Sequence, residues 1–245
     1  MNRVDVLGVG FDPVDLEAAA AFVVDLIRLG GPHLVVTANV ELVMRARHSP
    51  DLRALLGRAA LVVSDGVGVV WGARQLGRPL PGRVPGIDLA GRLCREAARR
   101  GWRIYLLGGA PGVALAAAER LRVQHPGIQV VGAAPGYFAP ADELAVLAAI
   151  RGAAPTLLLA GLGSPQQEQW LDRHLDVLGV PVAIGVGGTL DVWGGRVRRA
   201  PVPVQRLGLE WCYRLIRQPG RAGRQTAIPR FVMAVWQERR RTARR

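Results

Sequence analysis

Several side chains that could take part in group transfer come directly after predicted strands. Asp65 follows the apolar run Ala60–Ser64, and Thr37 and Asn39 lie at the end of another such run. A carboxylate at this position could accept the proton of an attacking hydroxyl group, which is the work of a general base. Aspartate and asparagine are also common helix N-caps, so capping explains Asp65 about equally well, and Asn39 could cap a helix beginning near Val40.

Two glycine-rich turns have a composition that suits phosphate binding. One contains Gly109 and Gly112, and the other contains Gly163, with Gln167 four residues later. Glycine lets the backbone approach a phosphate closely, and the next helix presents free N–H groups at its positive end. Ser164 and Gln167 have the spacing of a capping box, so Gln167 could both cap a helix and contact a ligand.

The elements that must position these residues alternate along the chain. Short β-branched runs predict strands, and amphipathic stretches such as Ile87–Arg100 and Val113–Gln124 predict helices between them. The candidate strands are His33–Thr37, Ala60–Ser64, Arg103–Leu107, Ile128–Val131, Thr156–Ala160 and Val182–Val186. This order predicts an α/β, Rossmann-like, mainly parallel sheet with helices on both faces, and Val4–Val9 could add an edge strand or hairpin. The carboxyl ends of parallel strands share one edge, so the candidate residues should converge there.

Charge is distributed unevenly along the chain. All 32 basic residues are arginines, and 14 of them lie in residues 196–245 beside only two glutamates. That segment carries a net charge of +12, whereas residues 1–195 carry +1. Such asymmetry indicates a polyanionic partner: nucleic acid, an anionic membrane or the phosphates of a substrate. The run Ala200-Pro201-Val202-Pro203 predicts a break in secondary structure, so we divide the chain into a catalytic domain of residues 1–195 and a basic helical appendage of residues 196–245.

Two helices are predicted in this appendage, over Leu209–Gln218 and from Ile228 to about Arg241. The apolar face of the second consists of Ile228, Phe231, Val232 and Val235. Packing on the core explains that face about as well as lying on a membrane does, and the arginine excess and Trp236 favour the membrane. No uninterrupted apolar run reaches the roughly 18 residues of a spanning helix, and the N-terminus lacks the apolar core of a signal peptide, so we expect a soluble or peripheral protein.

No metal or other cofactor is predicted. The four histidines have no ligand spacing, and there is no D-x-D motif of the kind that holds a divalent ion on a sugar nucleotide. Asp12 and Asp15 have the wrong spacing, and Asp12 is better explained as a helix cap before Pro13. Cys94 and Cys212 are isolated and are expected to be packing residues of a reduced protein.

Taken together, these motifs resemble those of the WecG/TagA/CpsF glycosyltransferases, glycosyltransferase family 26, from Thr37 to about Arg224. The matching elements are Thr37-x-Asn39, Asp65-Gly66-x-Gly68, Arg83-Val84-x-Gly86-x-Asp88, Pro126-Gly127 with Gly132 and Gly136-Tyr137-Phe138, Gly161-x-Gly163-x-Pro165-x-Gln167-Glu168, Gly185-Val186-Gly187, Arg199-Ala200-Pro201, and Gly208-Leu209-Glu210-Trp211-x-Tyr213-Arg214-Leu215 with Pro219, Arg221 and Arg224 beyond. The chain departs from the family pattern at Gln166, where a basic residue is usual, and at Leu190, where phenylalanine is usual. These departures lie near the sheet edge and bear on the donor sugar.

The resemblance implies an inverting, metal-independent transfer of a sugar from a UDP-sugar to a polyprenyl-diphosphate-linked sugar. N-acetylmannosamine ranks first as the transferred sugar, with its uronic acid and glucose left open, and N-acetylglucosamine ranks first as the acceptor. Such a reaction is expected to belong to the synthesis of wall teichoic acid linkage units, enterobacterial common antigen or exopolysaccharide repeats. It places the protein in the cytoplasm, peripherally bound to the inner face of the bacterial cell membrane, with anionic lipid as a partner.

The resemblance also implies a role for individual residues. Asp65 matches the proposed catalytic base of the family. The residues that match substrate-binding positions are Thr37, Asn39, Arg83, Gln167, Arg214, Arg221 and Arg224. The last three are expected to reach the acceptor diphosphate from the appendage, and arginine suits this because its fork binds phosphate oxygens in pairs.

Two other functions compete with this one. A nucleic-acid-binding protein with a basic tail would use the same charge, but the tail has patterned aromatic residues, and no helix-turn-helix or RNA-recognition signature is present. We therefore expect no nucleic-acid partner. A nucleotide-dependent oxidoreductase is the second rival, and neither glycine-rich turn completes its G-x-G-x-x-G fingerprint. The oligomeric state stays open.

Overall fold

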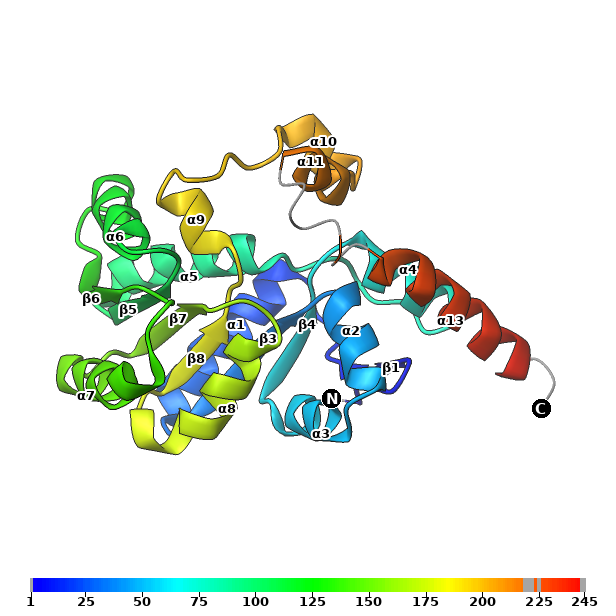
Figure 1. Cartoon of the computed structure of the whole chain (residues 1–245), viewed down its shortest axis with the longest axis horizontal. Coiled ribbons are helices and arrows are strands. Elements are labelled where there is room, and N and C mark those ends of the chain that lie inside the picture. The colour runs from blue at the N-terminus through cyan, green and yellow to red at the C-terminus, as the bar shows by residue number, and fades with distance from the viewer. Residues whose placement is uncertain (1, 218–222, 224–225, 243–245) are drawn as a thin grey trace.

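A computed structural model describes residues 2–217, 223 and 226–242 of the chain. Its main sheet has six strands in the order β4-β3-β8-β7-β5-β6, and every neighbouring pair is parallel. The strands are β3 (His33–Ala38), β4 (Leu61–Ser64), β5 (Arg103–Gly108), β6 (Gln129–Ala134), β7 (Leu157–Gly161) and β8 (Val182–Gly185). Helices cover both faces of this sheet (Figure 1), so the prediction of an α/β, Rossmann-like fold is confirmed.

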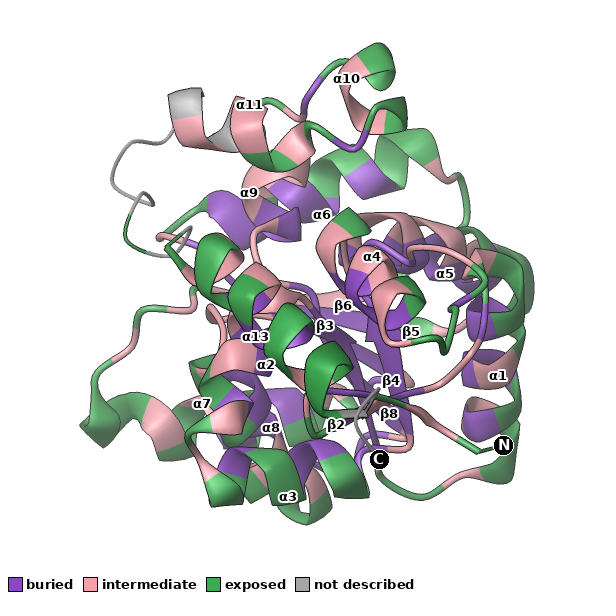
Figure 2. Cartoon of the chain, turned by 90° about the vertical axis from the view of Figure 1, so that its right-hand side faces the viewer, coloured by how far each residue is buried: buried purple, intermediate pink, exposed green. Residues whose placement is uncertain are grey.

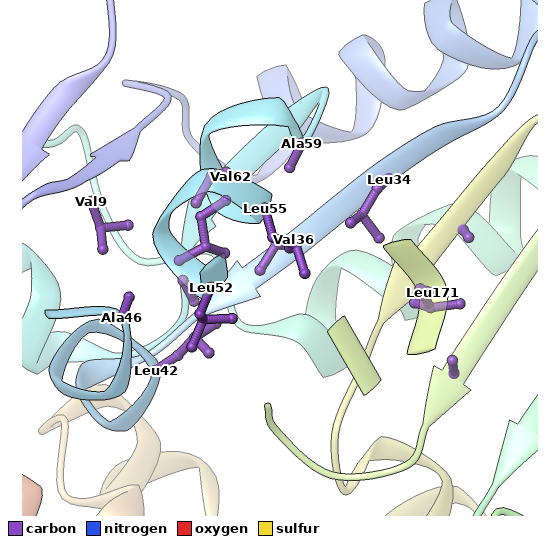
Figure 3. Packing of buried hydrophobic residues seen from close by; sticks show 14 of the residues in the cluster. Val9, Leu34, Val36, Leu42, Ala46, Leu52, Leu55, Ala59, Val62 and Leu171 are labelled. Carbon is purple, nitrogen blue, oxygen red and sulfur yellow. The ribbon is translucent and has the colours of Figure 1, made fainter. Parts of the chain in front are cut away.

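The observed strands agree with the predicted ones to within three residues at either end, because both faces of the sheet are buried. Leu34 and Val36 of β3 point into one hydrophobic cluster, and Val35 points into the other. Figure 3 shows side chains from β3, β4, α2 and α3 meeting in the first cluster. A strand buried on both sides needs a continuous apolar run, and such runs can be located from sequence.

Two layers of helices enclose the sheet. One layer contains α1 (Leu16–Leu29), α5 (Gly86–Arg100), α6 (Val113–Gln124) and α9 (Thr189–Trp193). The other contains α2 (Val40–Arg47), α3 (Pro50–Arg58), α4 (Val67–Gln75), α7 (Glu143–Ala153), α8 (Gln166–Leu178) and α13 (Ala227–Thr242), with a short 3-10 turn, η1 (Pro140–Asp142), before α7. The apolar side of each helix closes the core against one face of the sheet.

The N-terminus forms a β-hairpin beside the main sheet. β1 (Val4–Val6) and β2 (Val9–Phe11) pair antiparallel in a sheet of their own, which confirms the hairpin alternative and extends it by two residues. Leu7 and Gly8 between them both have positive φ, 56° and 88°, as a two-residue hairpin loop favours.

Asp12 does not cap a helix, so that prediction is wrong. Its carboxylate accepts a hydrogen bond from Val62 N at 2.8 Å and pairs with Arg3, which ties the hairpin to β4. The cap of α1 is Asp15, whose side chain accepts from Ala18 N at 2.8 Å.

The last helix, α13, packs against α2 and α4. Phe231, Ala234 and Val235 are buried, and a Cβ atom at Gly72 of α4 would lie 2.6 Å from the Phe231 ring. The predicted apolar face of this helix therefore lies on the core, and the preference for a membrane surface is wrong for that face. Trp236 is 55% exposed.

Between α9 and α13 the chain forms α10 (Val202–Arg206) and α11 (Glu210–Arg217), which stand apart from the helical layers in Figure 1. The predicted break is real before Val202, but Pro203 lies in the first turn of α10 because proline is tolerated there. Within the described ranges, no helix is long and apolar enough to span a membrane. The division of the chain at residue 195 stays a prediction.

Candidate active site

Asp65 and Asn39 come together at the carboxyl edge of the sheet. β3 and β4 pair with Ala38 opposite Ser64, and Asp65 N donates to Ala38 O at 2.9 Å. Asn39 caps α2 by accepting from Leu42 N at 3.0 Å, as predicted. The N-cap of α4 is Gly66, without a side-chain cap, so the capping explanation of Asp65 is wrong.

Thr37 is buried and bonded within the protein. Its hydroxyl donates to Gly185 O of β8 at 2.9 Å, and a Cβ atom at Gly86 would lie 2.9 Å from Thr37 Oγ1. Thr37 thus joins the ends of β3 and β8 and the start of α5. Contact between this residue and a substrate stays a prediction.

Gln167 is also buried, at 2% exposure, and the capping box predicted for it is wrong. α8 starts at Gln166, its N-cap residue Pro165 makes no side-chain hydrogen bond, and Ser164 Oγ has no hydrogen-bond partner among the described residues. Instead, Gln167 Oε1 accepts from Gly187 N at 3.0 Å, and Gln167 Nε2 donates to Glu168 Oε1 at 2.6 Å. The side chain is used to hold the turn after β8 rather than the end of its own helix.

Glu168 is a fully buried carboxyl group beside this turn, and the sequence interpretation gave it no role. Burial raises its pKa to about 7, against the opposing effects of Gln167 and Ser164. Glu168 Oε2 and Ser164 Oγ are both buried, and neither has a partner of good hydrogen-bond geometry among the described residues. One sequence signal could have found Glu168: it stands in helical register with Leu171 and Leu178, on the apolar side of α8.

A pocket of about 530 Å³ opens beside these residues, at the ends of β5, β7 and β8. Gly109 and Gly163, two of the three predicted phosphate-binding glycines, line it. The third, Gly112, is not among the lining residues and serves as the N-cap of α6. Arg173 and Asp191 give the pocket one charge of each sign.

Arg83, a predicted site residue, contacts the segment that leads into α11. Its guanidinium donates to Gln205 O at 2.8 Å and lies 3.9 Å from Glu210 Oε2. Arg199 forms a two-pronged ion pair with Asp88, at 2.5 and 2.9 Å, and lies 3.7 Å from Glu210 Oε1. Two arginines and two carboxylates thus join the start of α5 to the basic C-terminal segment.

The carboxylates of this cluster and the carboxylate of Asp65 all affect the pKa of Arg199. Burial lowers the pKa of the Arg199 guanidinium, but the carboxylates of Asp88, Glu210 and Asp65 outweigh burial and raise it overall. Arg199 is therefore a permanent cation at the carboxyl edge, electrostatically coupled to the candidate base. Arg199 and Asp88 both belong to the sequence motifs, but neither had a predicted role.

The remaining predicted residues lie in the C-terminal segment. Arg214 belongs to α11, but its side chain lies outside what the structure describes. Arg221 and Arg224 lie wholly outside the described residues. In the part of the chain that is described, no group of three or more His, Cys, Asp or Glu side chains is placed to hold a metal ion.

An open parallel sheet with helices on both faces defines a Rossmann-like α/β protein, whose ligand crevice lies at the carboxyl edge that holds the glycine-lined pocket and Asp65. The chain belongs to the glycosyl transferase WecG/TagA/CpsF family, whose sequence profile matches residues 4–245, so it is a glycosyltransferase and the resemblance is confirmed. It is 35% identical over 209 residues to a Bacillus spizizenii protein named N-acetylglucosaminyldiphosphoundecaprenol N-acetyl-beta-D-mannosaminyltransferase. This match covers 85% of the chain and 80% of the relative.

The pKa of Glu168 predicts how stability depends on pH. The group ionises near pH 4.5 in the unfolded chain and near pH 7 in the folded one, so the folded state binds more protons between these values. The free energy of unfolding contributed by Glu168 therefore falls as pH rises from about 4.5 to 7. Glu168→Gln cannot ionise, so its advantage over the wild type in urea unfolding should grow across that window. A difference that stays constant with pH would contradict the assignment.

Proposed function

We propose that this glycosyltransferase moves N-acetylmannosamine from a UDP-sugar to N-acetylglucosamine carried on a polyprenyl diphosphate, with inversion and without a metal ion. The name of the Bacillus spizizenii relative supports this choice of sugar and acceptor. The single structural observation that carries the proposal is Asp65, which lies at the same sheet edge as the glycine-lined pocket.

The pocket at the ends of β5, β7 and β8 is proposed to hold the UDP part of the donor. Its volume of about 530 Å³ falls within the range of small-molecule sites. Gly109 and Gly163 let the backbone approach a diphosphate, and Arg173 supplies positive charge. Asp191 can accept hydrogen bonds from ribose hydroxyls, as acidic residues do in related sheets.

Asp65 is proposed to be the general base of a single displacement. Its carboxylate takes the proton of the acceptor hydroxyl while that oxygen bonds to the anomeric carbon and the bond to the UDP oxygen breaks. Attack from the side opposite to UDP inverts the anomeric centre. The negative charge that grows on the leaving diphosphate requires cations or helix N-termini. Arg173 in the pocket and Arg199 near Asp65 supply positive charge.

The C-terminal segment is proposed to dock on the anionic inner surface of the cell membrane, where the lipid acceptor lies. Apolar side chains gather around α10 and α11: Val202, Leu207, Leu209 and Trp211 are 42–73% exposed. Figure 2 colours the described residues of both helices as exposed or intermediate. The net charge of +12 over residues 196–245 adds attraction to anionic lipid, at about 1 kcal/mol for each basic residue near the surface. Arg214, Arg221 and Arg224 are proposed to bind the acceptor diphosphate.

Asp65→Asn tests the proposed base. The amide keeps the size of the side chain but cannot take a proton, so turnover of UDP-N-acetylmannosamine should fall by about a hundredfold or more, while UDP binding by calorimetry is retained. Asp172→Asn is the matched control, because Asp172 pairs with Arg58 on the surface of α8 and should leave turnover unchanged. Near-normal turnover of folded Asp65→Asn would remove Asp65 from this role.

A charge substitution tests membrane docking. The double variant Leu207→Glu and Trp211→Glu should bind phosphatidylglycerol vesicles about tenfold or more weakly in a sedimentation assay, because two apolar anchors are lost. The control variant carries Leu29→Glu and Leu144→Glu, which replace exposed leucines of α1 and α7. Equal vesicle binding by the two double variants would rule out α10 and α11 as the docking surface.

A further inference from the structure

A buried chain of hydrogen bonds lies behind the pocket wall that Gly187 and Gly188 form. Glu168 Oε1 accepts from Gln167 Nε2 at 2.6 Å, and Gln167 Oε1 accepts from Gly187 N at 3.0 Å. Glu168 is 0% exposed and Gln167 is 2% exposed, so solvent does not compete with these bonds. Glu168 thus connects through a single side chain to a residue that lines the pocket.

The chemistry of a side-chain amide makes Glu168 important to this connection. The two ends of the amide have nearly the same shape, but the oxygen only accepts hydrogen bonds and the nitrogen only donates them. Gly187 N–H requires the oxygen end, and Glu168 Oε1, as an acceptor, requires the nitrogen end. Without Glu168, the Gln167 amide loses one of the two partners that select this orientation, and its N–H group becomes an unsatisfied buried donor.

The turn after β8 has little room to rearrange if the hydrogen bond from Gln167 to Glu168 is lost. A Cβ atom at Gly185 would lie 2.7 Å from Gln167 Nε2 and 3.2 Å from Glu168 Oε1, so strand and side chains are already in close contact. On the other side, the Thr37 hydroxyl holds Gly185 O at 2.9 Å. The backbone of Gly185–Gly187 is therefore clamped by Thr37 on β3 and by Gln167 on α8.

We propose that Glu168 is a positioning residue for the donor site: by orienting the Gln167 amide, it holds the Gly187 backbone and with it the pocket wall that receives the nucleoside diphosphate. Glu168 itself does not touch substrate. The predicted effect of Glu168 on donor affinity rests on the proposed binding of UDP in this pocket. The predicted effect of Glu168 on the Gly187 amide is independent of any ligand.

The test compares Glu168→Ala, Glu168→Gln and Leu178→Ala by UDP calorimetry and steady-state kinetics. Glu168→Ala should raise the Kd for UDP and the KM for the donor about tenfold while leaving the KM for the acceptor unchanged. Glu168→Gln should stay within about threefold of the wild type, because its amide oxygen can still accept from Gln167. Leu178→Ala is the control for lost stability, since Leu178 is buried in the last turn of α8, about 15 Å along the helix from Glu168.

A double-mutant cycle with Gln167→Ala separates action through Gln167 from a direct effect. The double variant should bind UDP no more weakly than Gln167→Ala alone. Any of four results would overturn the proposal. UDP affinity could fall additively in the double variant, or equally in Glu168→Ala and Leu178→Ala. It could also fall as far in Glu168→Gln as in Glu168→Ala, or stay at the wild-type value in Glu168→Ala.

Hydrogen exchange at the Gly187 amide, followed by NMR without ligand, tests the positioning apart from the proposed function. Exchange should be faster in Glu168→Ala than in Leu178→Ala and the wild type. If the wild type fails to bind UDP, only the proposed use of the pocket is refuted. Unchanged Gly187 exchange in Glu168→Ala would refute the positioning role, whatever the pocket binds.

Discussion

Close packing around Gly161 and Gly185, the glycines that end β7 and β8, is the constraint on which the rest of the site depends. A Cβ atom at Gly161 would lie 2.6 Å from Gly187 O, and one at Gly185 would lie 2.7 Å from Gln167 Nε2. A side chain at Gly161 or Gly185 would collide with these groups, so only glycine lets the turn after β8 and the start of α8 lie so close to the strand ends. Parallel topology places the pocket at the ends of β5, β7 and β8 on the same sheet edge as Asp65 and Asn39, and the glycine contacts shape its wall there.

The basic C-terminal segment is joined to this edge by charge and by apolar packing. Arg199 pairs with Asp88, Arg83 contacts Gln205 O, and Phe231 is buried against α4. Removing residues from 196 onward would therefore expose the core surfaces that α13 covers. Point substitutions in α10 and α11 are a cleaner probe of docking than truncation, because they leave the packing of α13 intact.

Much of the site could be predicted because its chemistry follows local rules. Strands buried on both faces are continuous apolar runs, and Asp65 and Asn39 come directly after two of them, so parallel topology alone places both at one edge. The Asn39 cap also depends only on neighbouring residues. The Asp65 cap failed as a prediction because Gly66 takes that position, and sequence cannot decide between two adjacent candidates.

The rest of the site depends on contacts between residues far apart in the chain. Asp88 and Arg199 are separated by 111 positions, and no local pattern pairs them. Gln167 has the spacing of a capping box but bonds to Gly187, 20 positions away, because β8 lies beside its helix. The apolar face of α13 is visible in the sequence, but its partner is not, since a core helix and a membrane surface would both accept it.

The most direct test of the central claim is release of UDP from a panel of UDP-sugars, with a synthetic lipid-diphosphate N-acetylglucosamine acceptor and excess EDTA. Metal-independent transfer of N-acetylmannosamine predicts that UDP-N-acetylmannosamine is consumed fastest, only when the acceptor is present, and at the same rate with and without EDTA. A lack of acceptor-dependent UDP release from every donor, or activity that returns only when Mg²⁺ or Mn²⁺ is added, would contradict it.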